Sequence, residues 1–436
     1  MAQTEAQATA RLSSRAKVSS MRPDRAERYL RRTAAWTLLF FLLQGQLGSI
    51  WDREWHYFVG RDWFWTPPHT LIYSSVAGAG LIALAVILTD TIRYLKGVPG
   101  VNDTSTVCIF KIFHAPLGFI IAGFGALQTL AAAPLDNYWH NLYGIDIALW
   151  APFHMMGVTG GMIGNLGMVY IFASEAAIER ESGYPYHRFL GLSLLEWGTL
   201  IILAGMINFT LIGFLQFPIA TFGLLRIPSY PLPITIISAL VLIGAVRFTQ
   251  RPGTATLTIL LLSLHTVSEG LFVPWAIRTA VVQQNLSYRI PGIIPSFNLT
   301  DALLPLIFIV SALIIDGVAL WRLRRDHKLG GSMSSTLKWV LPTTLRVYGL
   351  RPSGKTQGST WLLGVLITIP QLLIAPCLIL GTWDLPRVFL EQPGANTPPE
   401  LKLQAALIAV PVILASGALG AFLGANFGDI WHWNTR

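Results

Sequence analysis

Two segments of the chain carry the same series of aspartate and histidine residues, set among tryptophan, glycine and proline. In each copy a histidine follows the first aspartate by four residues, and the last histidine ends a Trp-x-Pro-x-His sequence. The later copy has one additional residue before its tryptophan. The members are Asp52, His56, Asp62 and His69 in the first copy, and Asp136, His140, Asp146 and His154 in the second. Because the chain has only nine histidines, the repetition indicates a shared role.

The spacing of these residues suits a metal site built at the turn between two helices. Residues four apart lie on one face of a helix, so a carboxylate and an imidazole would project together from its last turns. Proline is favoured in the first turn of a helix, which places the last histidine of each copy at the start of the next helix. Imidazole with carboxylate suits copper, iron, zinc or manganese. The aspartates would either bind the ion directly or accept the second N–H of an imidazole.

The two cysteines narrow the choice of ligands. Cys108 and Cys377 lie in apolar segments and form no Cys-x-x-Cys pair, so neither a thiolate zinc site nor a disulfide framework is expected. The site must use nitrogen and oxygen ligands, and we expect copper or iron. Paired histidines also serve as axial ligands of haem, but haem does not need the aspartates, so we rank it lower.

A structural interpretation of the motif competes with the metal site. The tryptophans of both copies would belong to an interfacial aromatic belt, and the aspartates and histidines would only cap helices and form hydrogen bonds near the lipid headgroups. A third interpretation is an ancestral hairpin that was duplicated and whose site survives in one copy.

The composition is that of a polytopic membrane protein. Hydrophobic residues make up 53% of the chain and charged residues 12%, and the mean hydropathy is +0.54. Soluble domains typically contain about twice this share of charged residues. We expect an all-α fold of about ten transmembrane helices, of which the first four form two tandem repeated hairpins. Apolar segments long enough to cross about 30 Å of hydrocarbon lie near residues 33–51, 69–92, 106–134, 149–174, 189–217, 231–248, 254–274, 299–321, 361–381 and 403–427.

Positive charge predicts the orientation of these helices. With the N-terminus inside, most of the 31 Lys and Arg fall in cytoplasmic segments, as short loops require. Both copies of the motif then face the extracytoplasmic side of a prokaryotic plasma membrane, and both termini are cytoplasmic. The expected regions are a basic tail (1–32), the duplicated hairpin pair (33–174), a second bundle region (175–321), a cytoplasmic basic loop (322–360) and a C-terminal transmembrane hairpin (361–436).

Other ionisable residues fall within the apolar segments. His265 and Glu269 share one helix face, and in hydrocarbon they must face protein or water. We regard them as candidate catalytic residues that extend the metal site or relay protons, with a packed intrahelical pair as the alternative. Lys111, His114 and Glu196 are each expected to be satisfied interior polar residues, although Lys111 so near His114 suggests a polar cavity.

The sequence argues against nucleic-acid and nucleotide ligands and favours lipids and other membrane subunits as partners. The net charge of +9 follows from topology, and no nucleic-acid recognition module accompanies it. Gly349–Thr356 matches the phosphate-loop pattern, but the strand and soluble helix that the pattern requires are missing, so we expect no nucleotide. The basic tail suits contact with anionic membrane lipids, and other membrane subunits are expected partners.

The leading hypothesis is a membrane oxidoreductase, or a subunit of one, with a His/Asp metal centre at the extracytoplasmic face. Nitrogen and oxygen ligands on copper or iron suit oxygen chemistry or electron transfer, and the substrate would be an apolar compound or a quinol reached from the bilayer. The alternative is a transporter or channel for metal ions or protons, since such proteins also carry repeats and polar residues at the midplane. A second alternative is a non-catalytic subunit of a larger membrane complex.

Overall fold

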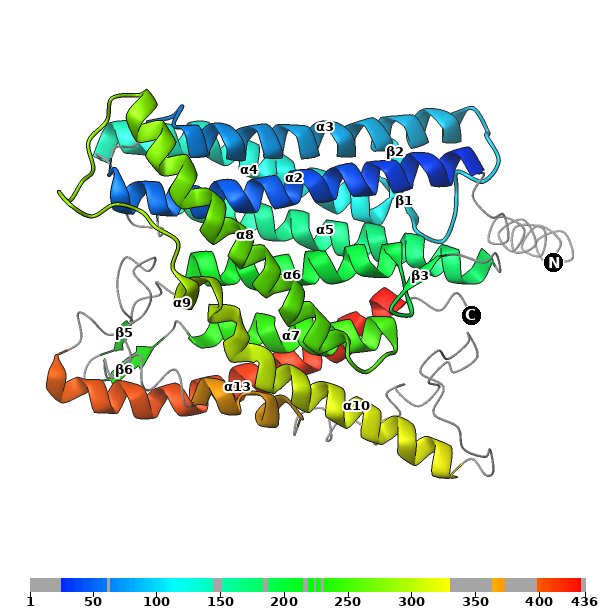
Figure 1. The fold of residues 1–436 in the computed structure, drawn as a ribbon. Coiled ribbons are helices and arrows are strands. Elements are labelled where there is room, and N and C mark those ends of the chain that lie inside the picture. Colours follow the sequence, from blue (N-terminus) through cyan, green and yellow to red (C-terminus); the bar gives the residue numbers. More distant parts are fainter. Residues whose placement is uncertain are drawn as a thin grey trace, which may run out of the picture. The chain divides into compact units, whose positions relative to one another are not determined.

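The computed structural model is predominantly helical (Figure 1). It describes residues 25–60, 63–143, 151–182, 187–214, 219–222, 225–228, 231–329, 363–372 and 398–432. Within these ranges, nine helices are long and apolar enough to cross a membrane. The expectation of an integral membrane protein is therefore confirmed at this level. Of the segment 361–381 only residues 363–372 are described, so the count of ten helices and the tandem duplication stay predictions.

The described residues fall into two compact units. Of the described residues, unit 1 comprises 25–44, 73–143, 151–182 and 187, and unit 2 comprises 45–60, 63–72 and the described residues from 188 to 432. The helices are α2 (Arg25–Phe58), α3 (Pro67–Leu95), α4 (Leu117–Tyr143), α5 (Pro152–Ser182), α6 (Leu194–Phe214), α7 (Pro231–Thr249), α8 (Thr254–Gln283), α9 (Leu299–Ala302), the 3-10 helix η1 (Leu304–Phe308), α10 (Ile309–Leu329) and α13 (Pro399–His432). The first copy of the motif lies in unit 2 and the second in unit 1.

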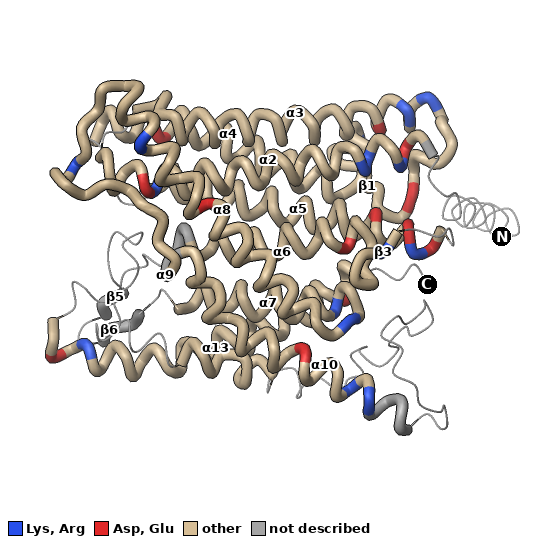
Figure 2. Tube along the Cα trace, viewed as in Figure 1, with Lys and Arg blue, Asp and Glu red and all other residues tan. Residues whose placement is uncertain are grey.

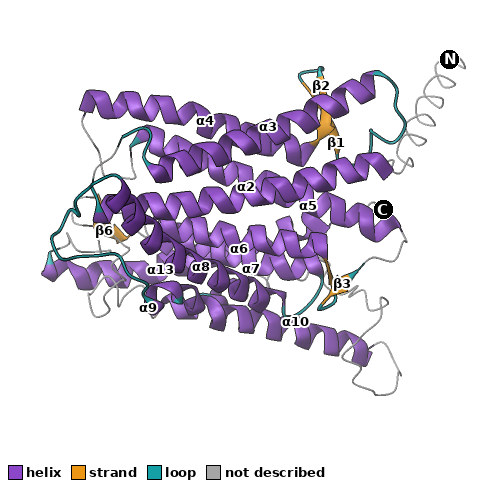
Figure 3. Ribbon diagram, turned by 45° about the horizontal axis from the view of Figure 1, so that its top comes forward, coloured by secondary structure: helices purple, strands orange, loops and turns teal. Residues whose placement is uncertain are grey.

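In the described part of the chain, three antiparallel hairpins interrupt the helices (Figure 3). They pair β1 (Thr106–Ile109) with β2 (Phe113–Pro116), β3 (Arg188–Phe189) with β4 (Leu192–Ser193), and β5 (Ile219–Phe222) with β6 (Leu225–Pro228). Two of them, β1–β2 and β3–β4, run directly into a helix, α4 and α6 respectively. Most of these residues fall in the apolar segments expected from the sequence, because a short apolar run does not distinguish a strand from a buried helix.

The hairpin β1–β2 corrects the segment 106–134. Helix α4 begins at Leu117, and Lys111 lies in the turn before it, with φ of +59° next to Phe110 with φ of +52°. The last strand pair is Ile109 with Phe113, so the connecting loop has three residues, two of which adopt positive φ as tight hairpin loops often require. The placement of Lys111 and His114 within a membrane span was wrong, since Lys111 is exposed in the turn and His114 lies on β2.

Glu196 belongs to a helix cap. Helix α6 begins at Leu194, and the backbone N–H of Ser193 donates to Glu196 Oε2 at 2.8 Å. The backbone N–H of Glu196 in turn contacts Ser193 Oγ at 3.2 Å. This reciprocal arrangement is a capping box, which satisfies backbone donors at the start of a helix. The carboxylate therefore has a structural role in the first turn of α6.

Small residues allow helices within each unit to approach closely. In unit 1 helix α4 packs along α5, and in unit 2 helix α7 packs along α13. A Cβ added at Gly424 of α13 would lie 2.6 Å from the carbonyl oxygen of Leu240 in α7, closer than side chains tolerate. Such backbone contact through glycine is typical of helix pairs in membranes, where van der Waals packing replaces the hydrophobic effect.

Charged residues gather toward the ends of the helices, and their middle stretches are largely free of Lys, Arg, Asp and Glu (Figure 2). One group in unit 1 is deeply buried. Arg31 of α2 is 0% exposed, and its guanidinium meets Glu27 at 2.9 Å, Asp90 at 3.0 Å and Asp103 at 2.5 Å. It also donates to the carbonyl of Val101 at 3.0 Å. Arg31 thereby ties the loop after α3 to helices α2 and α3.

Candidate metal centre

The first cluster lies where α2 ends and α3 begins, within unit 2. Asp52 and His56 project from the last turns of α2, and His69 is the third residue of α3 after Pro67 and Pro68. The hydroxyl of Thr66 lies 3.4 Å from the backbone nitrogen of His69, the position of an N-terminal helix cap. The prolines and this cap explain why α3 begins here and why His69 projects from its first turn.

Asp52 joins both histidines. Its Oδ1 lies 3.1 Å from His69 Nε2, and its Oδ2 lies 3.7 Å from His56 Nε2. One ligand atom from each of the three residues lies within 4.8 Å of the others. The side chains are 19% exposed for Asp52 and 12% exposed for each histidine, so this donor set is largely removed from solvent.

The orientation of the His69 ring determines which of its nitrogens can bind a cation. His69 Nδ1 lies 3.2 Å from the carbonyl oxygen of Trp63, and a carbonyl only accepts, so Nδ1 carries a proton. Unless the ring is doubly protonated, Nε2 then directs a lone pair at the Asp52 carboxylate. A cation between two such acceptors, or protonation of the ring, resolves their repulsion. The carbonyl contact at Nδ1 is the arrangement that commonly orients a metal-bound histidine.

The second cluster repeats this geometry in unit 1. Asp136 and His140 lie in the last turns of α4, and His154 is the third residue of α5. Asp136 Oδ2 lies 3.2 Å from His140 Nε2 and 3.3 Å from His154 Nε2. The two imidazole rings are 5.5 Å apart between centroids. One carboxylate oxygen thus faces two imidazole nitrogens that come from successive helices.

Two buried atoms of the second cluster have no hydrogen-bond partner among the described residues. They are Asp136 Oδ1 and His154 Nδ1. In the first copy the corresponding Nδ1 meets the carbonyl six residues earlier, and the residue six positions before His154 is Ala148, which lies outside the described ranges. The Oδ1 atom leaves the carboxylate with capacity for a further bond.

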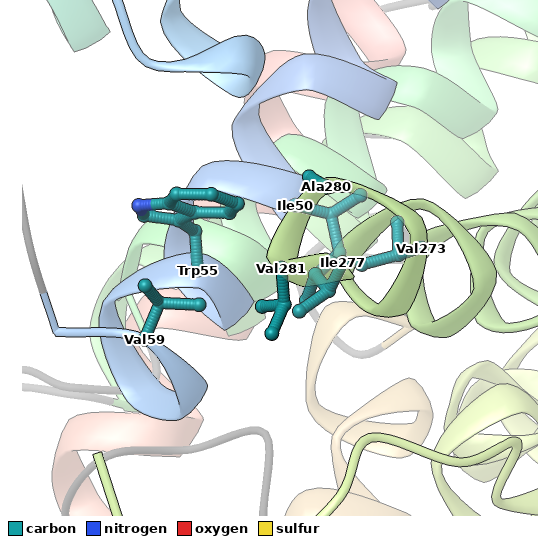
Figure 4. Close-up of a cluster of buried hydrophobic side chains, with 7 residues drawn as sticks. All are labelled: Ile50, Trp55, Val59, Val273, Ile277, Ala280 and Val281. Carbon is teal, nitrogen blue, oxygen red and sulfur yellow. The ribbon is translucent and has the colours of Figure 1, made fainter. Parts of the chain in front are cut away.

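Hydrophobic packing fixes the end of α2 that carries the first cluster. Ile50, Trp55 and Val59 pack against Val273, Ile277, Ala280 and Val281 of α8, and Trp55 is 0% exposed (Figure 4). The backbone N–H of Arg289 also donates to the carbonyl of Phe58 at 2.7 Å, close to the last residue of α2. The end of α2 that carries Asp52 and His56 is therefore held in place by its packing against α8 and by the hydrogen bond from Arg289.

The distances within both clusters fit a single ion with nitrogen and oxygen ligands. Two donors bound at about 2.0–2.1 Å to a tetrahedral ion lie roughly 3.3 Å apart. The carboxylate–imidazole distances are 3.1 Å and 3.7 Å in the first cluster and 3.2 Å and 3.3 Å in the second. Asp52 with His56 and His69, and Asp136 with His140 and His154, would hold the ions. Each set supplies three protein ligands, which leaves a position for a substrate or water.

The other site residues predicted from the sequence lie outside both clusters or outside the described residues. Asp62 and Asp146 lie outside the described residues, as does Gly349–Thr356. His265 Nε2 and Glu269 Oε1 lie 3.0 Å apart on α8, and Asn208 of α6 donates to the same Oε1 at 3.0 Å. Glu269 is 4% exposed, so it faces protein as expected, while a catalytic role for the pair stays a prediction.

His114 forms a separate polar contact in unit 1. Its Nε2 lies 3.1 Å from Asn102 Oδ1, and its ring stacks on Tyr94 with centroids 3.7 Å apart. Burial lowers the pKa of His114 below its ordinary value, and the nearby positive charge of Arg31 lowers that pKa further. Both effects favour the neutral form of the His114 ring.

The buried ion pairs of Arg31 were missed by sequence reasoning. Arg31 had been grouped with the basic tail, because a cluster of arginines before a first span usually stays in the cytoplasm. Its partners Asp90 and Asp103 are 59 and 72 residues away in the chain. The available signal was the pair Glu27 and Arg31, four residues apart, which suits an ion pair on a helix.

Comparison with models of known protein families, with curated protein sequences and with solved structures finds no significant match. Functional inference for this chain therefore depends on the geometry and chemistry of its own residues.

Proposed function

We propose that this chain is an integral membrane oxidoreductase, or the metal-binding subunit of one, in which each Asp/His cluster holds a copper or iron ion. The observation that carries the proposal is the contact of Asp52 Oδ1 with His69 Nε2 at 3.1 Å while His69 Nδ1 meets a carbonyl. Two acceptors held face to face favour a cation between them. In the second copy, Asp136 likewise lies between His140 and His154, with one ligand atom of each residue within 4.8 Å of the others.

The donor set supports the choice of metal. Neutral imidazole suits copper and iron, and a carboxylate adds the negative charge that stabilises a divalent ion. When bound at a site with an open position, such an ion would supply one-electron and oxygen chemistry. The protein's residues hold the ion, exclude bulk water and orient the imidazoles. An apolar or quinol substrate would enter from the bilayer, and the clusters would face the extracytoplasmic side if the positive charges set the orientation.

Elemental analysis of protein purified without chelators tests the proposal. We expect copper or iron in stoichiometric amount, with a visible or paramagnetic signal that changes on chemical reduction. The paired variant His69→Gln and His154→Gln should lose most of the metal, since each retains only part of its ligand set. Exposed His187 supplies the matched control, and His187→Gln should retain the metal. A protein that folds normally and contains neither metal would contradict the proposal. An intense Soret band would indicate haem instead.

A specific observation also supports a transporter of protons or metal ions. His265, Glu269 and Asn208 form a buried polar group on α8 and α6, and ionisable residues inside a membrane commonly mark an ion path. Glu269→Gln separates the two functions. In an oxidoreductase this change should lower turnover or metal content without ion flux, whereas in a transporter it should abolish proton or ion flux across liposomes and leave bound metal unchanged.

A further inference from the structure

A buried amide on α2 has no hydrogen-bond partner among the residues that the structure describes. Gln46 is 2% exposed, and neither its Oε1 nor its Nε2 has a partner in those ranges. Buried amides are nearly always hydrogen-bonded, because an unpaired one loses its contacts with water and gains nothing in return. Because neither the oxygen nor the nitrogen of this amide has a partner, we look for a bound molecule that donates to Oε1 or accepts from Nε2.

Three further polar side chains of unit 2 come from α6, on which Gln46 packs, and from α8. Gln46 packs on Gly205 of α6, where an added Cβ would lie 2.5 Å from its Nε2. Asn208 follows Gly205 by three residues and so lies on the same face of α6. Its amide donates to Glu269 Oε1, which His265 Nε2 also meets at 3.0 Å. We call these four polar residues, Gln46, Asn208, His265 and Glu269, the Gln46 site.

The Gln46 site adjoins a face of α8 that is exposed in a membrane-spanning helix. Leu260, Leu264 and Leu271 are 51%, 65% and 58% exposed, which is the pattern of a lipid-facing stripe. His265 follows Leu264 in sequence, and its side chain is 20% exposed. His265 is therefore partly accessible next to this face, and a ligand dissolved in the bilayer would reach the site from this side.

Aromatic side chains lie C-terminal to the polar residues of the Gln46 site on α2 and α8. Trp51 of α2 and Phe272 of α8 form an edge-to-face pair with ring centroids 5.9 Å apart. Trp51 Nε1 is buried and has no acceptor among the described residues. This region thus offers aromatic surfaces for a ring and a second N–H donor for an oxygen atom on it.

We infer that the Gln46 site binds the ring head group of a lipid-soluble quinol. One quinol hydroxyl donates to the Glu269 carboxylate and accepts from Gln46 Nε2, and the ring lies against Trp51 and Phe272. Because Gln46 and Asp52 are six residues apart on α2, the site lies about 9 Å along the helix axis from the first cluster. This inference rests on the proposed function and names its substrate class.

Binding of a decyl-substituted benzoquinol to the purified full chain in nanodiscs, measured anaerobically by calorimetry, tests the inference. We expect saturable binding that Gln46→Leu weakens by about tenfold or more, which corresponds to about 1.4 kcal/mol. Gln44→Leu is the matched control, because the Gln44 amide lies on the same helix and donates to the hydroxyl of Ser74 in an exposed position. This control should bind the quinol as the unchanged protein does.

Two results would overturn the inference. The first is the absence of saturable binding to the unchanged protein. The second is an equal affinity of the Gln46→Leu and Gln44→Leu proteins, which would mean that water alone satisfies the amide. If Gln46→Leu does not fold, the isosteric Glu269→Gln should weaken binding instead, and unchanged affinity would again overturn the inference.

Metal content measured on the same preparations separates the two proposals. Quinol binding without metal would contradict the oxidoreductase function while leaving the Gln46 site as a quinol-binding site. Metal without quinol binding would overturn only the Gln46 site.

Discussion

His154 Nε2, at the start of α5, and Asp136 Oδ2, near the end of α4, lie 3.3 Å apart. The same oxygen meets His140 Nε2 at 3.2 Å, so one carboxylate links imidazoles from two successive helices. Asp52 does the same for His56 and His69. A carboxylate shared in this way suits a metal ligand better than an ordinary helix cap, which would direct its oxygen at backbone N–H groups.

The orientation in the membrane can be tested by chemical labelling. In a protein whose Cys377 is replaced by serine, cysteines introduced at Arg61 and Asn141 should react with an impermeant thiol reagent in intact cells. Native Cys108 is exposed on β1 and should react only after permeabilisation, since the distribution of positive charge predicts a cytoplasmic location for it. The predicted orientation would be contradicted if Cys108 reacted in intact cells, or if Arg61→Cys or Asn141→Cys reacted only after permeabilisation.

The buried ion pairs of Arg31 should dominate the stability of unit 1. Arg31→Leu leaves Glu27, Asp90 and Asp103 without their shared cation, and we expect a loss of about 3–5 kcal/mol in the free energy of unfolding. Arg28→Leu on the same helix should change that free energy by about 0.5 kcal/mol or less. Unfolding in detergent with increasing denaturant measures both. Equal effects of the two changes would show that the Arg31 contacts contribute little.

His114 should make stability depend on pH. Its pKa is lowered in the folded protein by burial and by Arg31, so the unfolded chain takes up a proton first as the pH falls. The contribution of His114 to the free energy of unfolding should therefore be complete above about pH 6.5 and should decline below that pH. His114→Gln should flatten this decline, measured by thermal unfolding between about pH 7.5 and 5.5. His187→Gln, at an exposed position, should leave it unchanged, and an identical decline in both variants would remove His114 as the cause.

The close contact of α7 with α13 predicts a contrast between two glycines of unit 2. Gly424→Ala would place a methyl group 2.6 Å from the carbonyl oxygen of Leu240, and we expect a loss of about 1–3 kcal/mol from overpacking. Gly317 of α10 has no atom within 4 Å of an added Cβ. Gly317→Ala should instead stabilise the helix by about 0.5–1 kcal/mol. Thermal unfolding of both variants checks the signs, and a stabilising Gly424→Ala would contradict the packing.

The sequence predicted those features that depend on local spacing. Apolar runs located most of the membrane helices, and the four-residue interval with a following proline located the helix ends that carry Asp52, His56 and His69. Features that depend on long-range contacts could not be found in this way. Arg31 resembles a topology signal until Asp90 and Asp103 are seen beside it, and nothing near Gln46 in the sequence shows that its amide is buried.

The strand pairing at residues 106–116 shows a different limit. Phe113 and Ala115 continue the apolar run of α4 in the sequence, so hydropathy alone extended the helix too far. The turn at Phe110 and Lys111 has no glycine to mark it, although both residues adopt positive φ. Hairpin turns without glycine or asparagine give little local signal, and the error in placing Lys111 followed.

Metal titration of chelator-treated protein tests the central claim most directly. We expect the unchanged chain to bind two equivalents of copper or iron, one for each cluster of three ligands. Asp52→Ala and Asp136→Ala should each lose one equivalent while keeping the other, and the double variant should lose both. If the unchanged protein and the double variant bind the same amount of metal, the clusters are not the metal sites and the account is contradicted.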